Sequence, residues 1–369
     1  MGPDIVEIFN IAPEITWSLW AVQYSFLMTV SCGCVFLSWP GIVLKRAAWI
    51  LPSKTALILA MTCGICAPIA LLADLHHPSR FLNFYLHFQS GSWMAWGACF
   101  IVFYIGALLV YAWFAFMPVL ARVGQEGGRY APFARLLCRG ESEEKTRALR
   151  AAATACLFAA ILIMIYTGAE FLFIRARPLW NTIAIPALMA LSGVAGAAGF
   201  SLALLRFASN SKGNGIVLSG VIAWTQAAIL AVVSIWLAAG LSGLSTPAAL
   251  AVKTAFPATS FRLMAGGFVA LTLLIWLCAA RRGGNGILLG TLTLCSAWLF
   301  RWLVYIGGQQ MPKTGAGYYD YSLPLGYEGL LGMAGTLGLW AFVFFAITCL
   351  VPLSHLGENA EIGNIGGSS

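Results

Sequence analysis

The stretch Leu71–Phe88, which reads LLADLHHPSRFLNFYLHF, places an aspartate, three histidines and an arginine directly after an apolar run. Carboxylate and imidazole groups accept and release protons, and imidazole does so near neutral pH. Asp74 and His77 are therefore candidate proton acceptors, with His76 as a polar neighbour. Asp74 and Arg80 also have a simpler interpretation, in which they cap and anchor the end of a helix.

A second candidate group lies inside the apolar runs themselves. Tyr166 and Glu170 are four residues apart, so they share one face of a helix. A charge inside a membrane span costs about 2.5–3.5 kcal/mol, so Glu170 and Arg301 are functional candidates. Arg301 has an alternative role as the structural partner of a carboxylate such as Glu170. The other polar and aromatic candidates near the ends of these runs are Trp17, Trp20, Gln23, Tyr24, Arg177, Trp180, Asn181, Tyr305, Gln309 and Gln310.

The composition indicates which solvent surrounds these residues. Hydrophobic residues make up 60% of the 369 residues and charged residues 9%, whereas about 25% is normal for charged residues in globular proteins. Apolar runs of about 18 residues or more predict spanning helices. The predicted spans are 17–43, 55–73, 92–116, 151–174, 182–205, 216–241, 261–280, 287–306 and 329–350. The sequence therefore predicts an all-α integral membrane protein with about nine transmembrane helices.

The distribution of basic residues predicts the orientation of these spans. Alternate loops face opposite sides of the membrane, and the set that contains the loop 118–150 holds the larger share of Lys and Arg. The positive-inside rule places that set in the cytoplasm. We therefore expect a multi-pass protein of a bacterial or archaeal cytoplasmic membrane, with the N-terminus outside and the tail 351–369 inside. The net charge of +8 is then a feature of topology and does not indicate nucleic-acid binding.

This orientation brings the candidate residues to one level of the membrane. Asp74, Glu170 and Arg301 all lie toward the outer ends of their spans, as do the first residues of the first span. The inner half of the predicted bundle contains no comparable set. Single Trp and Tyr residues at a membrane edge are usually interfacial anchors, but the whole cluster is typical of a functional site.

Haem and protein-bound metal are not expected in this chain. A bis-histidine haem needs two histidines on facing helices within the bilayer. His76, His77 and His87 instead share one outer connection, and His355 follows the last span. The CGC and CGIC sequences lie within predicted spans, where small polarizable cysteine side chains pack between helices.

Acidic, phenolic and amide groups at one depth beside lipid are suited to quinol oxidation. Each quinol releases two protons with its two electrons, and a carboxylate or imidazole within reach can accept a proton as a general base. Apolar walls hold the ring and the tail. The electrons need an acceptor that this chain does not contain, so a partner subunit is expected.

Several motifs in order resemble one known family. DLHHPSRFLNFYLH is followed by SWMAWGA, YTG, ARPLWNT, LSGVAGAAG and RWLVYIGGQ, and this succession resembles the NrfD/PsrC family between about residues 17 and 310. Within the family, WAVQYSFL and CAPIALLADLHHPSRFLNFY most resemble the membrane subunits of the tetrathionate reductase type.

The resemblance implies a haem-free anchor that binds menaquinol or ubiquinol. It implies two four-helix bundles with one extra helix. It also implies electron transfer to a four-cluster iron–sulfur subunit and onward to a molybdopterin catalytic subunit. The predicted orientation of the polar cluster places both partners on the extracytoplasmic side. The family's quinone-binding tyrosine of the fourth helix corresponds to Tyr166. On the first helix, Gln23 and Trp20 stand where a more strongly charged residue is expected, and Glu170 departs from the usually apolar residues after YTG.

Two other classes of function remain open from the sequence. A secondary transporter or a proton-translocating, channel-like protein would carry its polar groups near the midplane, usually with broken helices. Pro68 and Pro186 permit such breaks, but the polar cluster lies away from the midplane. A purely structural anchor would need no set of acid–base groups.

Overall fold

The computed structural model describes residues 15–75, 77–138, 144–208, 215–281, 285–311, 319 and 321–356. Regular structure in these ranges is entirely helical. The long helices are α1 (Leu19–Ile42), α2 (Ile50–Asp74), α4 (Trp93–Glu126), α6 (Glu144–Leu172), α7 (Ala184–Ala208), α8 (Ile216–Leu241), α10 (Thr259–Ala280), α11 (Gly286–Trp302) and α13 (Leu330–Leu350). The short ones are η1 (Ala47–Trp49), η2 (Pro78–Arg80), α3 (Asn83–Leu86), α5 (Ala131–Leu137), α9 (Thr246–Ala255), η4 (Leu303–Gly307), α12 (Gly308–Gln310) and η5 (Leu353–Leu356).

The described part of the chain contains nine helices that are long and apolar enough to cross a membrane, which confirms the predicted number. Their outward faces are apolar, and Ile235, Leu274 and Phe342 are exposed examples from α8, α10 and α13. Lipid accepts such faces, and a helix can span it because the backbone polar groups of a helix are satisfied within the helix. The chain is an integral membrane protein.

The segment 118–150, predicted as a loop between the third and fourth spans, contains helical structure in its described residues. α4 continues through Pro118 to Glu126, α5 follows, and α6 begins at Glu144. Pro118 removes one backbone hydrogen bond, but its neighbours Val119 and Leu120 are buried in the core, and this burial offsets the loss. α4 ends only at Gly127, whose φ of 76° gives the left-handed cap that favours glycine.

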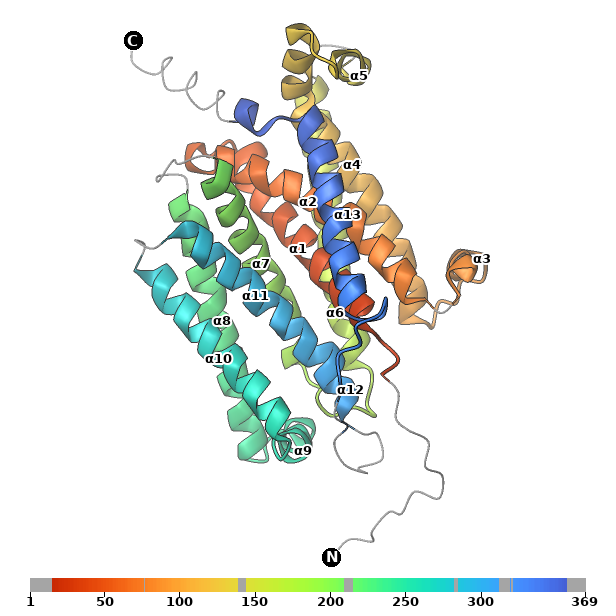
Figure 1. Cartoon of the computed structure of the whole chain (residues 1–369), viewed down its shortest axis with the longest axis vertical. Helices are drawn as coiled ribbons and strands as arrows, with labels where there is room; N and C mark the ends of the chain where they lie inside the picture. The colour runs from red at the N-terminus through yellow and green to blue at the C-terminus, as the bar shows by residue number, and fades with distance from the viewer. Residues whose placement is uncertain are drawn as a thin grey trace, which may run out of the picture.

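The contacts between helices form two rings of four. In the first ring, α2 and α6 each contact both α1 and α4; in the second, α8 and α11 each contact both α7 and α10. α7 joins the rings through contacts with α1, α2 and α6, and α13 packs against α2 and α1. Figure 1 shows α5 at one end of α4, and α3, α9 and α12 toward the opposite end of the molecule. These are called the α5 end and the α3 end below.

Small residues allow the rings to approach closely at α7. A Cβ added to Gly33 of α1 would lie 2.8 Å from the backbone oxygen of Gly193 on α7. A Cβ added to Gly290 of α11 would lie 2.4 Å from the oxygen of Gly199 on α7. Such contacts are typical of membrane helices, whose association depends on close packing. They hold α1 and α11, the helices that carry several candidate residues, against α7.

Candidate functional site

The α3 end brings together the start of α1 and the end of α2. Ser18 is the N-cap of α1, and Asp74 is the last residue of α2. One carboxylate oxygen of Asp74 accepts hydrogen bonds from the Ser18 hydroxyl (2.6 Å) and the Ser18 backbone N–H (3.2 Å). A carboxylate beside a helix N-terminus is also favoured by the helix dipole. Asp74 therefore has the capping role that the sequence left open as its alternative.

The side chain of Gln309 on α12 forms hydrogen bonds with the residues that precede α1. Its Oε1 accepts from the Thr16 hydroxyl (3.2 Å) and the Trp17 N–H (3.0 Å). Its Nε2 donates to the carbonyl oxygens of Trp17 (3.0 Å) and Tyr305 (3.1 Å). An amide has two donors and two acceptor positions, so these bonds use all of them. Gln309, predicted as a quinone ligand, is therefore better suited to positioning Trp17.

Four rings form an aromatic cluster at this end, defined by Trp17, Phe171, Trp180 and Tyr305. Trp17 stacks on Trp180 with centroids 5.4 Å apart and planes 20° apart. Phe171 meets Trp17, Trp180 and Tyr305 edge-on at 5.7, 5.1 and 4.9 Å. Edge-on and stacked pairs of this kind stabilise by about 0.5–1.5 kcal/mol each. The cluster holds α1, α6 and the end of α11 in one fixed arrangement.

Arg177 and Trp180 donate hydrogen bonds to backbone carbonyls of η4, α12 and the residue that follows α12. The Trp180 indole donates to the Val304 oxygen at 2.7 Å. Arg177 Nη1 donates to the oxygens of Gly308, Gln309 and Met311 at 2.9, 3.0 and 3.1 Å, and its guanidinium lies 4.9 Å from the Trp180 ring centroid. Burial lowers the pKa of Arg177 from its ordinary value. Arg177 thus makes the backbone-carbonyl contacts of a helix cap.

A second group, the hydroxyl cluster, comprises Tyr24 on α1, Tyr166 and Glu170 on α6, and Tyr305 on η4. The phenol of Tyr24 lies within electrostatic range of each of the other three side chains. Tyr24 is 5% exposed, and its buried hydroxyl has no hydrogen-bond partner among the described residues. Buried polar atoms are nearly always paired, so an orphan hydroxyl needs an explanation. A bound ligand with a polar oxygen is one.

Tyr166 is placed by the absence of a side chain on α4. A Cβ added to Gly97 would lie 2.1 Å from Cζ of Tyr166 and 2.5 Å from its hydroxyl. Phe100 lies edge-on to the same ring, with centroids 6.5 Å apart. Gly97 belongs to the SWMAWGA motif, but spacing alone does not reveal this contact. Sequence reasoning also missed Ser18, although a serine before an apolar helix is an N-cap signal.

Arg301 is not paired with Glu170, which corrects that suggestion from the sequence: neither takes part in an ion pair among the described residues. Arg301 is fully buried, and its guanidinium donates to the Thr29 hydroxyl of α1 (2.6 Å), to the Ser192 hydroxyl of α7 and to the Met189 oxygen (3.0 Å). These bonds place Arg301 at the junction of α1, α7 and α11. They give it a structural role between the two rings.

The first-helix candidates have separate surroundings. Gln23 is buried beside Tyr24 in the chain. The Trp20 ring lies against Gly332 of α13, where a Cβ would meet it at 2.8 Å. The indole Nε1 of Trp20 is buried, and no described residue forms a hydrogen bond with it.

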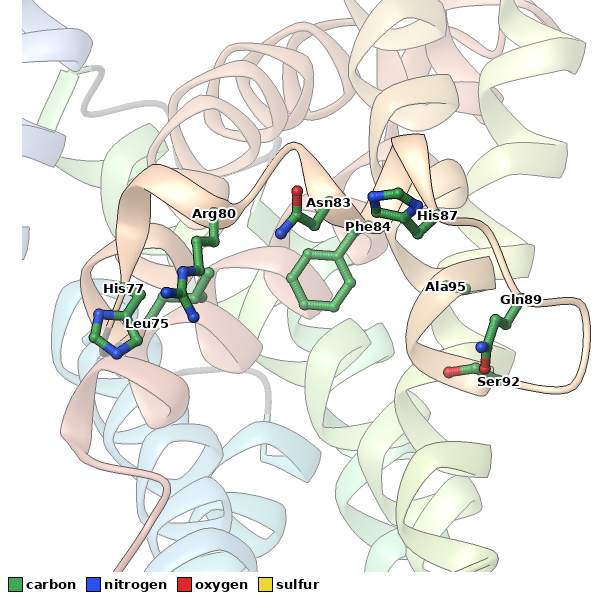
Figure 2. Close-up of a pocket in the computed structure, with 9 residues that line it drawn as sticks. All are labelled: Leu75, His77, Arg80, Asn83, Phe84, His87, Gln89, Ser92 and Ala95. Carbon is green, nitrogen blue, oxygen red and sulfur yellow. The ribbon is translucent and has the colours of Figure 1, made fainter.

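The polar residues of the stretch Leu71–Phe88 are divided between two places. His77, Arg80 and His87 line a pocket of about 410 Å³ and do not belong to the hydroxyl cluster. Its lining residues are Leu75, His77, Arg80, Asn83, Phe84, His87, Gln89, Ser92 and Ala95. Figure 2 shows Arg80, Asn83 and Phe84 projecting from the segment η2–α3 into this space. The pocket lies near the candidate residues at the α3 end. In the chain, its lining residue Leu75 follows Asp74, and its lining residue Ala95 lies two residues before Gly97, which adjoins Tyr166. His76 lies outside the described residues.

Comparison with known proteins identifies the family. Residues 8–313 match the family described as polysulphide reductase, NrfD. The chain belongs to the NrfD family. It is 34% identical over 353 residues to a tetrathionate reductase subunit of Salmonella typhimurium, covering 93% of this chain and 94% of that protein. It is 24% identical over 213 residues to a selenate reductase subunit of Mesobacillus selenatarsenatis, covering 54% of this chain and 50% of that protein.

Proposed function

We propose that this NrfD-family protein is the quinol-oxidising membrane subunit of a tetrathionate reductase-type complex. Its similarity to the Salmonella reductase subunit extends over nearly the full length of both chains, which supports a shared place in a complex. The partners are an iron–sulfur subunit with four clusters and a molybdopterin catalytic subunit. Both bind at the α3 end, and the distribution of basic residues supports an extracytoplasmic position for that end.

The hydroxyl cluster is the observation that carries this proposal. A quinol head presents two oxygens that need hydrogen-bond partners and two protons that need acceptors. The unpartnered Tyr24 hydroxyl, the Tyr166 hydroxyl and the Glu170 carboxyl supply both kinds of group at one place. The aromatic cluster beside them supplies apolar walls. These residues fit menaquinol or ubiquinol, whose bound ring supplies the two-electron chemistry.

Each residue has a distinct role in the proposed site. Tyr166 and Tyr24 hold the oxygens of the ring, and Glu170 accepts a proton as the general base. Asp74 holds the end of α2 against α1 and can receive a proton from the site in a later step. Gln309 and Arg177 position the aromatic cluster through the backbone contacts described above.

Purification through a C-terminal tag tests the assembly and its sidedness together. We expect the tagged protein to bring iron, molybdenum and bound quinone with it from detergent-solubilised membranes. We also expect the tag to bind antibody in inside-out vesicles and to be protected in right-side-out vesicles. A tag accessible only from the outside would overturn the proposed sidedness, and a preparation without iron–sulfur and molybdenum subunits would overturn the partners.

Gly97→Ala tests whether the position of Tyr166 matters. The added methyl group must displace the Tyr166 hydroxyl, because its Cβ would lie 2.5 Å away. A displacement of about 1 Å at a reacting group costs up to about 10²-fold, so we expect quinol-driven turnover to fall about tenfold. Gly106→Ala is the matched control on α4, since its Cβ meets nothing within 4 Å. Equal turnover in the two variants would contradict the role of Tyr166.

A further inference from the structure

A second pocket, of about 720 Å³, lies at the α5 end, away from the proposed quinol site. Three cationic side chains from separate segments line it: Lys45 after α1, Arg135 on α5 and Lys145 on α6. The other lining residues are Phe114, Met117, Pro118, Ala121, Gly124, Gln125, Cys138, Thr146 and Leu149. No carboxylate is among the described residues of this lining. The described lining therefore carries three positive side chains.

Two of these cations are available to a ligand. Within the described part of the chain, no hydrogen bond or ion pair engages the ammonium groups of Lys45 and Lys145. Arg135 uses Nε to donate to the Gly124 oxygen at 2.7 Å, which holds α5 against the end of α4. That bond fixes one wall of the pocket, so the three cations line a preformed space.

The backbone at Lys45 supports a role for its side chain. Lys45 has a φ of 56° and is the one non-glycine residue with positive φ among the described residues. Glycine or asparagine normally occupies such a position after a helix, and the left-handed conformation costs other residues about 1–2 kcal/mol. Lysine occupies this position although the backbone favours glycine or asparagine, which supports a role for its side chain.

The remaining walls are apolar and adjoin the lipid-facing surface. Phe114, Met117 and Leu149 line the pocket from α4 and α6, and Val110, Trp113 and Phe158 are exposed further along these two helices. We propose that this pocket binds the phosphate of an anionic phospholipid, with the acyl chains lying along α4 and α6. A free phosphate ion would use the cations but not the apolar half of the lining. Basic pockets between membrane helices are suited to such headgroups.

Native mass spectrometry of the full-length protein, delipidated in detergent, tests the proposal. We expect retention of added dioleoyl phosphatidylglycerol, with much weaker retention of dioleoyl phosphatidylcholine and none of inorganic phosphate. Lys45→Asn removes the charge while suiting the left-handed backbone, and Lys145→Gln removes the second charge. Each variant should weaken phosphatidylglycerol binding about fivefold, since each basic residue near a membrane surface contributes about 1 kcal/mol.

Neighbouring basic residues provide matched controls. Arg46 and Arg147 are exposed and do not line the pocket, so Arg46→Gln and Arg147→Gln should retain phosphatidylglycerol as the unaltered protein does. Equal weakening in all four variants would show a general charge effect and overturn the site. Retention of inorganic phosphate as strong as that of the lipid would identify an anion site instead and would also overturn the proposal.

Discussion

Replacing Glu170 by glutamine lowers quinol-driven turnover at least about tenfold, because general acid–base groups typically contribute about 10²–10⁴-fold. Glutamine keeps the size of the side chain and its place on the face shared with Tyr166, but it cannot accept the quinol proton. The measurement is the steady-state rate with a short-chain menaquinol or ubiquinol analogue as the electron donor to the intact complex.

Two comparisons separate this effect from a loss of assembly. A low-potential dye that reduces the iron–sulfur subunit directly should support the unchanged rate, because it bypasses the membrane site. Glu126→Gln is the matched carboxylate control: Glu126 pairs with His355 at 3.6 Å at the α5 end, and its loss should leave quinol oxidation intact. If Glu170→Gln oxidised quinol normally, the proton role would belong elsewhere, with Asp74 and His77 as the next candidates.

Replacing Arg301 by lysine destabilises the fold more than replacing it by methionine. Lysine keeps the buried charge but cannot donate to Thr29 of α1 and to Ser192 and Met189 of α7 at once. A buried charge that loses its partners costs about 3–5 kcal/mol. Methionine removes the charge, and the Thr29 hydroxyl remains bonded to the Ser25 oxygen at 2.7 Å, so fewer groups are left unsatisfied.

Thermal unfolding in detergent, followed by tryptophan fluorescence, checks this order. We expect the midpoint to fall most for Arg301→Lys and less for Arg301→Met. Arg262→Lys is the control, because Arg262 is exposed on α10 and donates only to Thr259 among the described residues. A lysine variant as stable as the control would mean that the guanidinium does not join α1 and α7 to α11.

The sequence predicted the spans well because lipid imposes a single requirement on each of them. A run of apolar residues long enough to cross the membrane is visible without any knowledge of neighbours. The ends were harder to predict: Pro118 indicates the end of a helix locally, yet α4 continues to Glu126 because its apolar neighbours are buried. Burial of this kind depends on other helices, which no local pattern contains.

The gathering of polar residues at one end was also predictable, but their partners were not. Alternating span directions placed Tyr166, Glu170 and Asp74 at one level of the membrane. Residue type alone could not show that all the amide positions of Gln309 are used by the chain before α1 and by Tyr305. Nor could it show that Arg301 donates to hydroxyls rather than to Glu170. An arginine within an apolar run indicates that it has a polar partner, but the sequence does not show which residue that partner is.

The π-helix η4 has a consequence for how this segment can change over evolution. A π-turn accommodates one more residue than an α-turn, so everything beyond it is rotated by about 100° relative to an uninterrupted α-helix. The amide of Gln309 forms its hydrogen bonds with the Trp17 backbone because the segment after η4 has this rotation. Loss of a single residue between 303 and 307 would restore the regular α-helix. The Gln309 amide would then turn away from α1, even with every other residue unchanged. The length of this short stretch therefore matters as much as its residue types, because an insertion or deletion there would move Gln309 away from Trp17.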